Sequence, residues 1–167
     1  MVRRRRVRRE REELAARDSA LRRPEEIQVF VCRRSGDEFL ALHRSPMQGG
    51  YWHPAAGALE EGEDAEQAAL RELTEEIGLD AADSLWPVRY EYGYLAAEEP
   101  PERQAEWPPG TERIAVTGFI AEAPPDFEPT LNWEHDEYRW CRLDQAIALF
   151  FWPDVGEALK ELWRRAG

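Results

Sequence analysis

A single helix, predicted between Gly62 and Gly78, constrains the chain more than any other segment. Glu63 and Asp64 open this segment, where acidic side chains favour the positive end of the helix dipole, and Gly78 suits a left-handed helix end. At about 100° per residue, the apolar and acidic side chains cluster on faces roughly 140° apart. The apolar face carries Leu70, Leu73 and Ile77, and the acidic face carries Glu72, Glu75 and Glu76. We therefore expect one side to pack on a sheet while the other presents carboxylates.

The three glutamates favour a divalent metal site. Like charges gathered at helical spacing cost stability unless a positive group lies among them. Mg²⁺ prefers oxygen ligands and binds through a few carboxylates together with substrate phosphates. For an arbitrary triplet of acids a solvated surface is the simpler explanation, so the residues around the triplet have to decide between the two.

Strand and helix signals on both sides of this helix predict an α/β fold. A β-branched run at residues 27–32 is typical of a strand buried on both faces. Further strands are expected over residues 39–43, 88–95, 114–120 and 138–143, and helices over residues 144–150 and 154–165. A Pro- and Glu-rich stretch at residues 96–110 is long enough to predict a substrate-side or mobile loop.

Length and composition suit one compact domain. With 167 residues, of which 43% are hydrophobic, the chain can bury a core, and we expect this domain to span residues 24–167. Residues 1–23 form a charged N-terminal extension, helical or disordered, with ten arginines and four acidic residues. RNA contact by this Arg-rich segment stays open as an alternative to a solvated tail.

The net charge of −12 is carried by the domain rather than by the basic extension. An acidic body repels nucleic acid and binds a polyphosphate poorly unless divalent cations lie between them. The sequence lacks both an apolar run of roughly 18 residues and the apolar centre of a secretory signal. We expect a cytoplasmic protein with no membrane partner, in which Cys32 and Cys141 are buried free thiols.

The residues around the acidic triplet form a longer motif. Gly57 lies six residues before Glu63, and Arg71-Glu72-Leu73-Thr74-Glu75-Glu76-Ile77-Gly78-Leu79 follows after seven more. This run resembles the Nudix box at every specified position. The resemblance covers 23 residues and implies a Nudix hydrolase, with an α/β/α sandwich built on a mixed β-sheet.

The resemblance also implies a role for each residue of the motif. The expected cofactor is Mg²⁺, with Mn²⁺ as an alternative. The implied metal ligands are Glu72, Glu75, Glu76 and a backbone carbonyl near Gly57. The structural positions of the motif are Gly57, Glu63 and Gly78. Arg71 joins the catalytic group mainly as an ion-pairing residue, and we favour Glu75 as the base that activates water, with Glu72 second.

A further acid lies in the run Trp133-Glu134-His135-Asp136-Glu137-Tyr138-Arg139-Trp140. This run resembles the Glu-His-x-x-Tyr-x-Trp segment of nucleoside and dihydroneopterin triphosphate pyrophosphohydrolases of the family, in which the glutamate completes the metal shell. The resemblance gives that role to Glu134, with Asp136 and Glu137 as rivals. We interpret His135 as a loop or capping histidine, because hard Mg²⁺ prefers oxygen.

Substrate contacts are predicted from residue type. Arg44 and Arg113 are candidates for phosphate binding. Candidates for stacking on a base are Trp52, Tyr92 and Trp107. Ala56 occupies a position where the family commonly has glycine.

The leading hypothesis is an Mg²⁺-dependent hydrolase that converts a nucleoside triphosphate or pterin triphosphate into a monophosphate and pyrophosphate. The alternative is a hydrolase of ADP-ribose, a dinucleotide or capped RNA 5′ ends. A non-catalytic nucleotide-binding module would belong to a different functional class, but the motif keeps every glutamate. Homodimerisation is left open.

Overall fold

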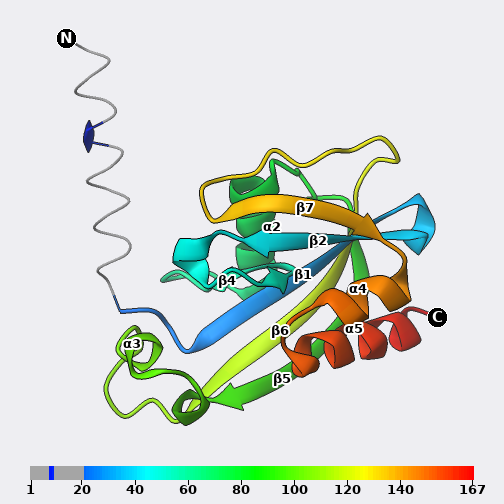
Figure 1. Cartoon of the computed structure of the whole chain (residues 1–167). Coiled ribbons are helices and arrows are strands. Elements are labelled where there is room, and N and C mark those ends of the chain that lie inside the picture. The colour runs from blue at the N-terminus through cyan, green and yellow to red at the C-terminus, as the bar shows by residue number, and fades with distance from the viewer. Residues whose placement is uncertain (1–7, 10–20) are drawn as a thin grey trace.

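The computed structural model describes residues 8–9 and 21–167, so most of the extension expected over residues 1–23 lies outside the described residues. In the described part of the chain, strands form one mixed sheet in the order β3-β2-β1-β6-β5, with β4 paired to β1 and β7 to β2 (Figure 1). The strands are β1 (Glu25–Arg33), β2 (Glu38–Arg44), β3 (Trp52–His53), β4 (Ala55–Ala58), β5 (Leu85–Leu95), β6 (Arg113–Glu122) and β7 (His135–Cys141). Strands β1 and β6 run parallel and the other pairs run antiparallel.

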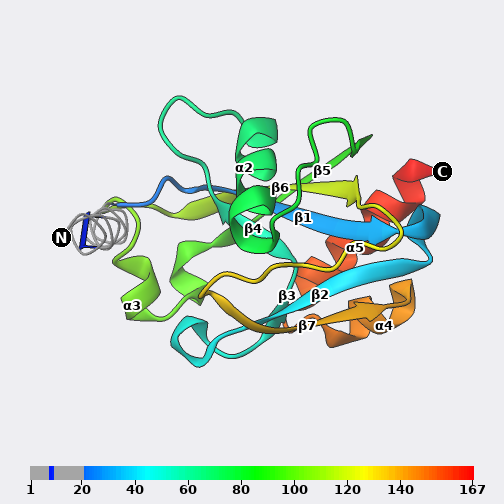
Figure 2. The ribbon, with the colours of Figure 1, turned by 90° about the horizontal axis from the view of Figure 1, so that it is seen from above.

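Helices cover both faces of the sheet. The helices are α2 (Ala65–Ile77), α3 (Pro101–Gln104), α4 (Leu143–Leu149) and α5 (Pro153–Ala166), and short 3-10 turns are η1 (Arg34–Gly36), η2 (Pro46–Gln48) and η3 (Ala96–Glu98). Helix α2 packs on β1 and β4, whereas α4 and α5 pack on the opposite face (Figures 1 and 2). The predicted α/β/α sandwich with a mixed sheet is confirmed.

Strand β1 is buried on both faces, as its β-branched sequence predicts. Ile27 and Val29 face the core beneath α2, and Phe30 and Cys32 face the core beneath α4 and α5. Burial of each of the Ile, Val and Phe side chains contributes about 1.5–3 kcal/mol, so β1 anchors both layers. Cys32 and Cys141 are buried free thiols, also as predicted.

Helix α2 has both of its predicted ends. The Asp64 side chain accepts a hydrogen bond from the Gln67 backbone N–H, and the Gln67 side chain accepts one from the Asp64 N–H, which completes a capping box. Gly78 ends the helix with φ 71°, a left-handed conformation that glycine adopts without strain. Leu73 and Ile77 are fully buried, which fixes the rotation of the helix and hence the direction of its glutamates.

The structure differs from the sequence prediction at two strands. Strand β5 begins at Leu85, earlier than residue 88, with an irregularity in its pairing between Leu85 and Arg89. Strand β7 spans His135–Cys141 rather than 138–143, because pairing with β2 already starts at His135 opposite Arg44. Leu143 instead begins α4.

The predicted loop at residues 96–110 contains η3 and α3 and holds its own small core. Trp107 is only 2% exposed and packs with Ala96 and Ile114, so this tryptophan is a core residue rather than a surface for stacking. No helix in the described ranges, residues 8–9 and 21–167, is long and apolar enough to cross a membrane.

Candidate active site

The glutamates of α2 differ in exposure. Glu72 and Glu76 are 8% and 1% exposed, whereas Glu75 faces solvent. The Glu76 carboxylate accepts a hydrogen bond from the Ala56 backbone N–H at 3.0 Å, so strand β4 holds it in place. A Cβ atom on Gly57 would overlap the Glu72 carboxylate, which explains why the motif needs glycine there.

Arg71 organises the acids at the surface of α2. Its guanidinium donates two hydrogen bonds to Glu63, at 2.8 and 2.9 Å. The same group donates to Glu72 at 2.8 Å and to Glu75 at 3.2 Å. A further bond to the Ala58 carbonyl at 3.0 Å ties the helix to the end of β4. Arg71 therefore positions the loop, the helix and two carboxylates together.

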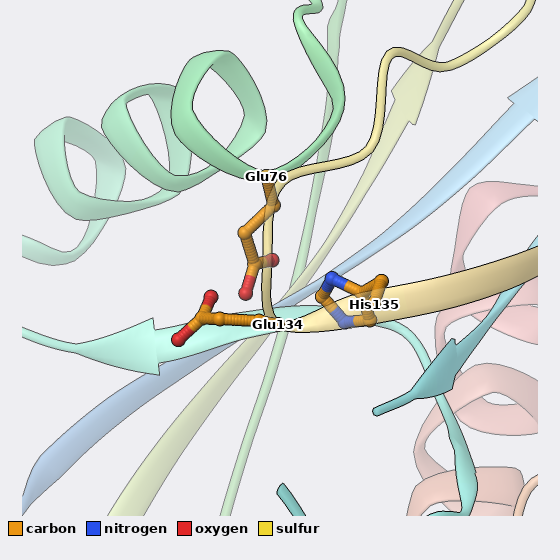
Figure 3. Close-up of side chains that lie close together, drawn as sticks. All are labelled: Glu76, Glu134 and His135. Carbon is orange, nitrogen blue, oxygen red and sulfur yellow. The ribbon is translucent and has the colours of Figure 1, made fainter. Parts of the chain in front are cut away.

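Glu134 reaches this cluster from a distant part of the chain. The loop before β7 caps α2, because the Thr130 N–H donates to the Ile77 carbonyl at 3.0 Å and the Asn132 N–H to the Glu76 carbonyl at 3.3 Å. The Asn132 side chain in turn accepts a hydrogen bond from the Glu134 backbone N–H at 3.1 Å. These bonds bring Glu134 beside Glu76 (Figure 3).

The two alternative acids of the same run, Asp136 and Glu137, pair with other side chains. Asp136 pairs with His43 at 2.6 Å, and Glu137 pairs with Arg139 at 3.4 Å. The first pair joins β7 to β2 and the second lies within β7. Among residues 8–9 and 21–167, the group with metal-ligating atoms within 4.8 Å of one another consists of Glu76, Glu134 and His135.

Burial is the main cause of the raised pKa values of the glutamates in the cluster. It raises the pKa of Glu72 to about 7, against the opposing charge of Arg71. It also raises the pKa of Glu76 well above its usual range, and the charges of Glu72 and Glu134 raise it further. Closely spaced, partly desolvated carboxylates are costly on their own, and a divalent cation with oxygen ligands relieves that cost. The residues present therefore fit a divalent metal.

Two buried histidines stay neutral at pH 7. Burial lowers the pKa of His53 to about 3 and that of His135 to about 4, and the charge of Arg44 lowers both further. Since His53 lines the pocket beside the acids, it contributes an uncharged polar wall there.

The acid cluster lies between two depressions. The first, which we call the sheet pocket, is lined by Glu72 and Glu134 and by the side chains Arg44, Tyr51, Tyr92, Arg103 and Trp152. The second, the helix groove, is lined by Arg71 and Glu75. Glu72, Glu134 and Arg103 line both, so the carboxylates stand at the junction.

The sequence profile of the NUDIX domain matches residues 22–162. The chain belongs to the NUDIX domain family. It is 35% identical to the asymmetrical bis(5′-nucleosyl)-tetraphosphatase of Sus scrofa over 114 residues, which are 66% of this chain and 69% of that protein. It is 31% identical over 136 residues to an octanoyltransferase of Myxococcus xanthus, covering 80% of this chain but only 35% of that protein.

Among solved structures, the Escherichia coli dihydroneopterin triphosphate pyrophosphohydrolase superposes with a TM-score of 0.73 at 24% identity, over 86% of this chain and 97% of that chain. At this identity the likeness supports the fold alone. The NUDIX family predicted from the residues of the motif is confirmed by these comparisons.

The structure gathers most of the predicted site residues of the NUDIX domain. Gly57, Glu72, Glu134 and Arg44 line the sheet pocket, with Glu76 buried beside them and Arg71 and Glu75 on the groove side. Trp52 lies elsewhere, under the Arg139 guanidinium at 4.7 Å, and Arg113 is exposed at the start of β6. Neither of these two residues is among those that line the sheet pocket or the helix groove.

Sequence reasoning missed several pocket residues. Arg103 belongs to the loop that the sequence predicts on the substrate side, but the Pro- and Glu-rich pattern of that loop does not point to an arginine within it. Tyr51 and Trp152, whose ring centroids are 6.0 Å apart, come from segments about a hundred residues distant. The Gly49-Gly50 loop and Pro153 mark both segments as loops, but no local pattern pairs them.

Proposed function

We propose that this protein is a divalent-metal-dependent hydrolase that cleaves a phosphoanhydride bond in a polyphosphate carried by a nucleoside or a pterin. From a triphosphate it releases the monophosphate and pyrophosphate. The convergence of Glu72, Glu76 and Glu134, of which Glu72 and Glu134 line the sheet pocket, carries this proposal. The pig and E. coli proteins that the chain resembles are named for polyphosphate substrates, which supports the same class.

Glu72, Glu76 and Glu134 would hold the metal, together with the carbonyl near Gly57. The resemblance implies Glu75 as a further ligand, but its exposed position on α2 favours a role as base over one as ligand. Mg²⁺ is the expected ion and Mn²⁺ the alternative. When bound, such an ion acidifies a coordinated water and neutralises charge on the phosphate oxygens. The Ala56 N–H and Arg71 keep two of these carboxylates oriented before the substrate arrives.

Glu75 is the proposed general base, and Glu72 is the second candidate. The Glu75 carboxylate lines the helix groove and accepts a hydrogen bond from Arg71 at 3.2 Å. It can therefore take a proton from a water at the junction and release it to solvent. Arg71 positions both candidates rather than contacting the substrate.

Arginines in the sheet pocket supply positive charge for the phosphates. Arg44 donates to the Gln48 side chain at 2.8 Å, which directs its guanidinium along the pocket wall. Arg103 lines both depressions and pairs there with Glu99 at 3.5 Å and with Glu106 at 3.8 Å. These two cations offset the negative charge of the cluster where a polyphosphate would lie.

Aromatic side chains at the rim of the sheet pocket suit a heterocyclic ring. Tyr51 and Trp152 meet edge to face, and Trp152 is 41% exposed. At the floor, the Tyr92 hydroxyl donates to Gln28 Oε1 at 2.6 Å, so the amide N–H₂ of Gln28 is available to a ring acceptor. Because Trp52 lies outside the pocket lining, we assign ring stacking to Tyr51 and Trp152.

A dinucleoside polyphosphate is the second candidate substrate. The helix groove shares Glu72, Glu134 and Arg103 with the sheet pocket, so a longer phosphate chain can run past the acids into it. Its wall includes Trp133, half exposed, which offers a surface for a second base. The likeness to the pig tetraphosphatase favours this candidate as well.

The decisive experiment is a substrate panel with Mg²⁺ and identified products. Nucleoside triphosphates, a pterin triphosphate, dinucleoside polyphosphates, ADP-ribose and triphosphorylated or capped RNA 5′ ends are compared at equal concentration. We expect hydrolysis of at least one polyphosphate and loss of that rate in Glu76→Gln. Glu66→Gln, an exposed glutamate of the same helix paired with Arg89 at 3.0 Å, is the matched control. Full activity in a folded Glu76→Gln protein contradicts the proposal.

A further inference from the structure

His135 has an environment that the proposed function leaves unexplained. Its side chain is buried, with 4% of the residue exposed, and neither ring nitrogen has a hydrogen-bond partner among the described residues. Buried imidazoles normally satisfy at least one nitrogen, because burying an unpaired polar group is unfavourable. A partner absent from the protein chain itself is therefore expected at this position.

The other two histidines in the chain are partnered. His43 Nδ1 lies 2.6 Å from Asp136, and His53 Nδ1 lies 3.0 Å from the Pro54 carbonyl. His135 thus differs from both, and its unpaired nitrogens are not a general property of histidines in this fold.

The ring of His135 faces two acids. In Figure 3 it lies beside the carboxylates of Glu76 and Glu134, with its nitrogens on the side of the ring toward them. One ligand atom from each of the three residues lies within 4.8 Å of the other two. A point equally far from three atoms that are 4.8 Å apart lies about 2.8 Å from each of them. Inward shifts of about 0.7 Å or less therefore bring all three atoms to the bonding distance of about 2.1 Å from one ion.

The donor set is therefore mixed, with two carboxylates and one imidazole. Hard Mg²⁺ selects oxygen and gains little from a nitrogen ligand, whereas imidazole favours first-row transition-metal dications. We propose that His135 is a direct ligand of the cation held by Glu76 and Glu134, so that this site takes a transition-metal dication in preference to Mg²⁺. The inference rests on the proposed function only in needing a cation at these carboxylates.

Mn²⁺ is the probe, because its unpaired electrons report directly on a coordinated nitrogen. Pulsed electron paramagnetic resonance of the whole protein with one equivalent of Mn²⁺ should show ¹⁴N modulation from imidazole. Growth on ¹⁵N-labelled histidine should replace it by ¹⁵N signals. The modulation should persist in His43→Gln, the matched control, and disappear in His135→Gln.

Competition between the two ions provides a second readout. Mn²⁺ should bind at least about tenfold more tightly than Mg²⁺ to the unsubstituted protein, and this ratio should fall severalfold in His135→Gln, which keeps an oxygen donor. An unchanged ratio overturns the preference. Thermal unfolding first establishes that the variant is folded.

A design that leaves His135 intact keeps the test valid if His135→Gln does not fold. The double variant His43→Gln/His53→Gln has His135 as its single histidine and should retain the ¹⁴N modulation. Loss of modulation there, or its absence from Mn²⁺-loaded unsubstituted protein, overturns His135 as a ligand and leaves the proposed function standing. If neither Mn²⁺ nor Mg²⁺ binds, both proposals are contradicted.

Discussion

The two sides of the site are built differently. The acid cluster is buried and held by backbone and guanidinium hydrogen bonds, from Ala56 to Glu76 and from Arg71 to Glu72. The sheet pocket is lined by partly exposed aromatic and arginine side chains from β2, β5 and α3, from the loop before β3 and from the residue that precedes α5. Rigid positioning suits groups that act on the reacting phosphorus, whereas an adaptable rim suits recognition of the remainder of the substrate. Substitutions on the two sides should therefore have separable effects.

The largest expected effect is on the catalytic step. Glu75→Gln should lower kcat by about 10²–10⁴-fold, the usual contribution of a general base, while Mg²⁺ affinity changes little. Glu72→Gln should weaken metal binding as well as kcat. Steady-state kinetics combined with calorimetric Mg²⁺ titration separates these outcomes. If Glu75→Gln keeps its full kcat, the assignment of the base is wrong.

The next largest effect is expected on stability, at the position where β4 lies closest to α2. Gly57→Ala should destabilise the protein by about 1–3 kcal/mol, because the added methyl group overlaps the Glu72 carboxylate. Chemical denaturation measures the change. Gly62→Ala tests whether any loop glycine behaves in this way, since an added Cβ there meets nothing within 4 Å, although its positive φ of 76° adds some strain. Equal losses of stability in the two variants would show that Gly57 has no special role.

The acid cluster should also give the metal-free protein a distinctive pH response. Folding raises the pKa of Glu72 from 4.5 to about 7, so its stabilising contribution is complete below pH 4.5 and is lost as pH rises through 7. His53, with its pKa lowered to about 3, changes stability in the opposite direction between pH 5 and 6.5. The comparison of Tm with Glu72→Gln isolates the first effect.

In EDTA, the Tm of the unsubstituted protein should therefore fall relative to that of Glu72→Gln between pH 5 and pH 8. Added Mg²⁺ should reverse this trend, since the cation stabilises the charged carboxylate. A constant difference in Tm across the range would mean that Glu72 titrates normally.

The smallest effect is expected on KM, from substitution of Trp152 in the sheet pocket. Trp152→Ala should raise KM about 2- to 12-fold with kcat nearly unchanged, in line with the 0.5–1.5 kcal/mol of one aromatic contact. Trp52→Ala is the matched control, since Trp52 packs under Arg139 outside the pocket lining. A larger change in KM for Trp52→Ala than for Trp152→Ala would indicate that the ring of the substrate binds on the other side of β3.

The contrast between the acid cluster and the sheet pocket also explains how much of the site could be predicted from the sequence. Helix α2, its ends and its acidic face follow from local spacing, and the adjacent Gly57 and Glu63 belong to the same motif. Glu134 could be predicted only through resemblance, because loop bonds to the end of α2 bring it near Glu76. Trp107 and Trp152 could not be told apart, since burial of one and exposure of the other depend on long-range packing.

The most direct measurement is a crystal structure of the protein soaked in Mn²⁺, with data collected at the manganese absorption edge. We expect an anomalous peak bounded by the carboxylates of Glu72, Glu76 and Glu134, and no such peak in Glu76→Gln crystals. A peak only at other surface acids, or no peak even with a polyphosphate analogue in the sheet pocket, would show that these three glutamates do not hold the metal.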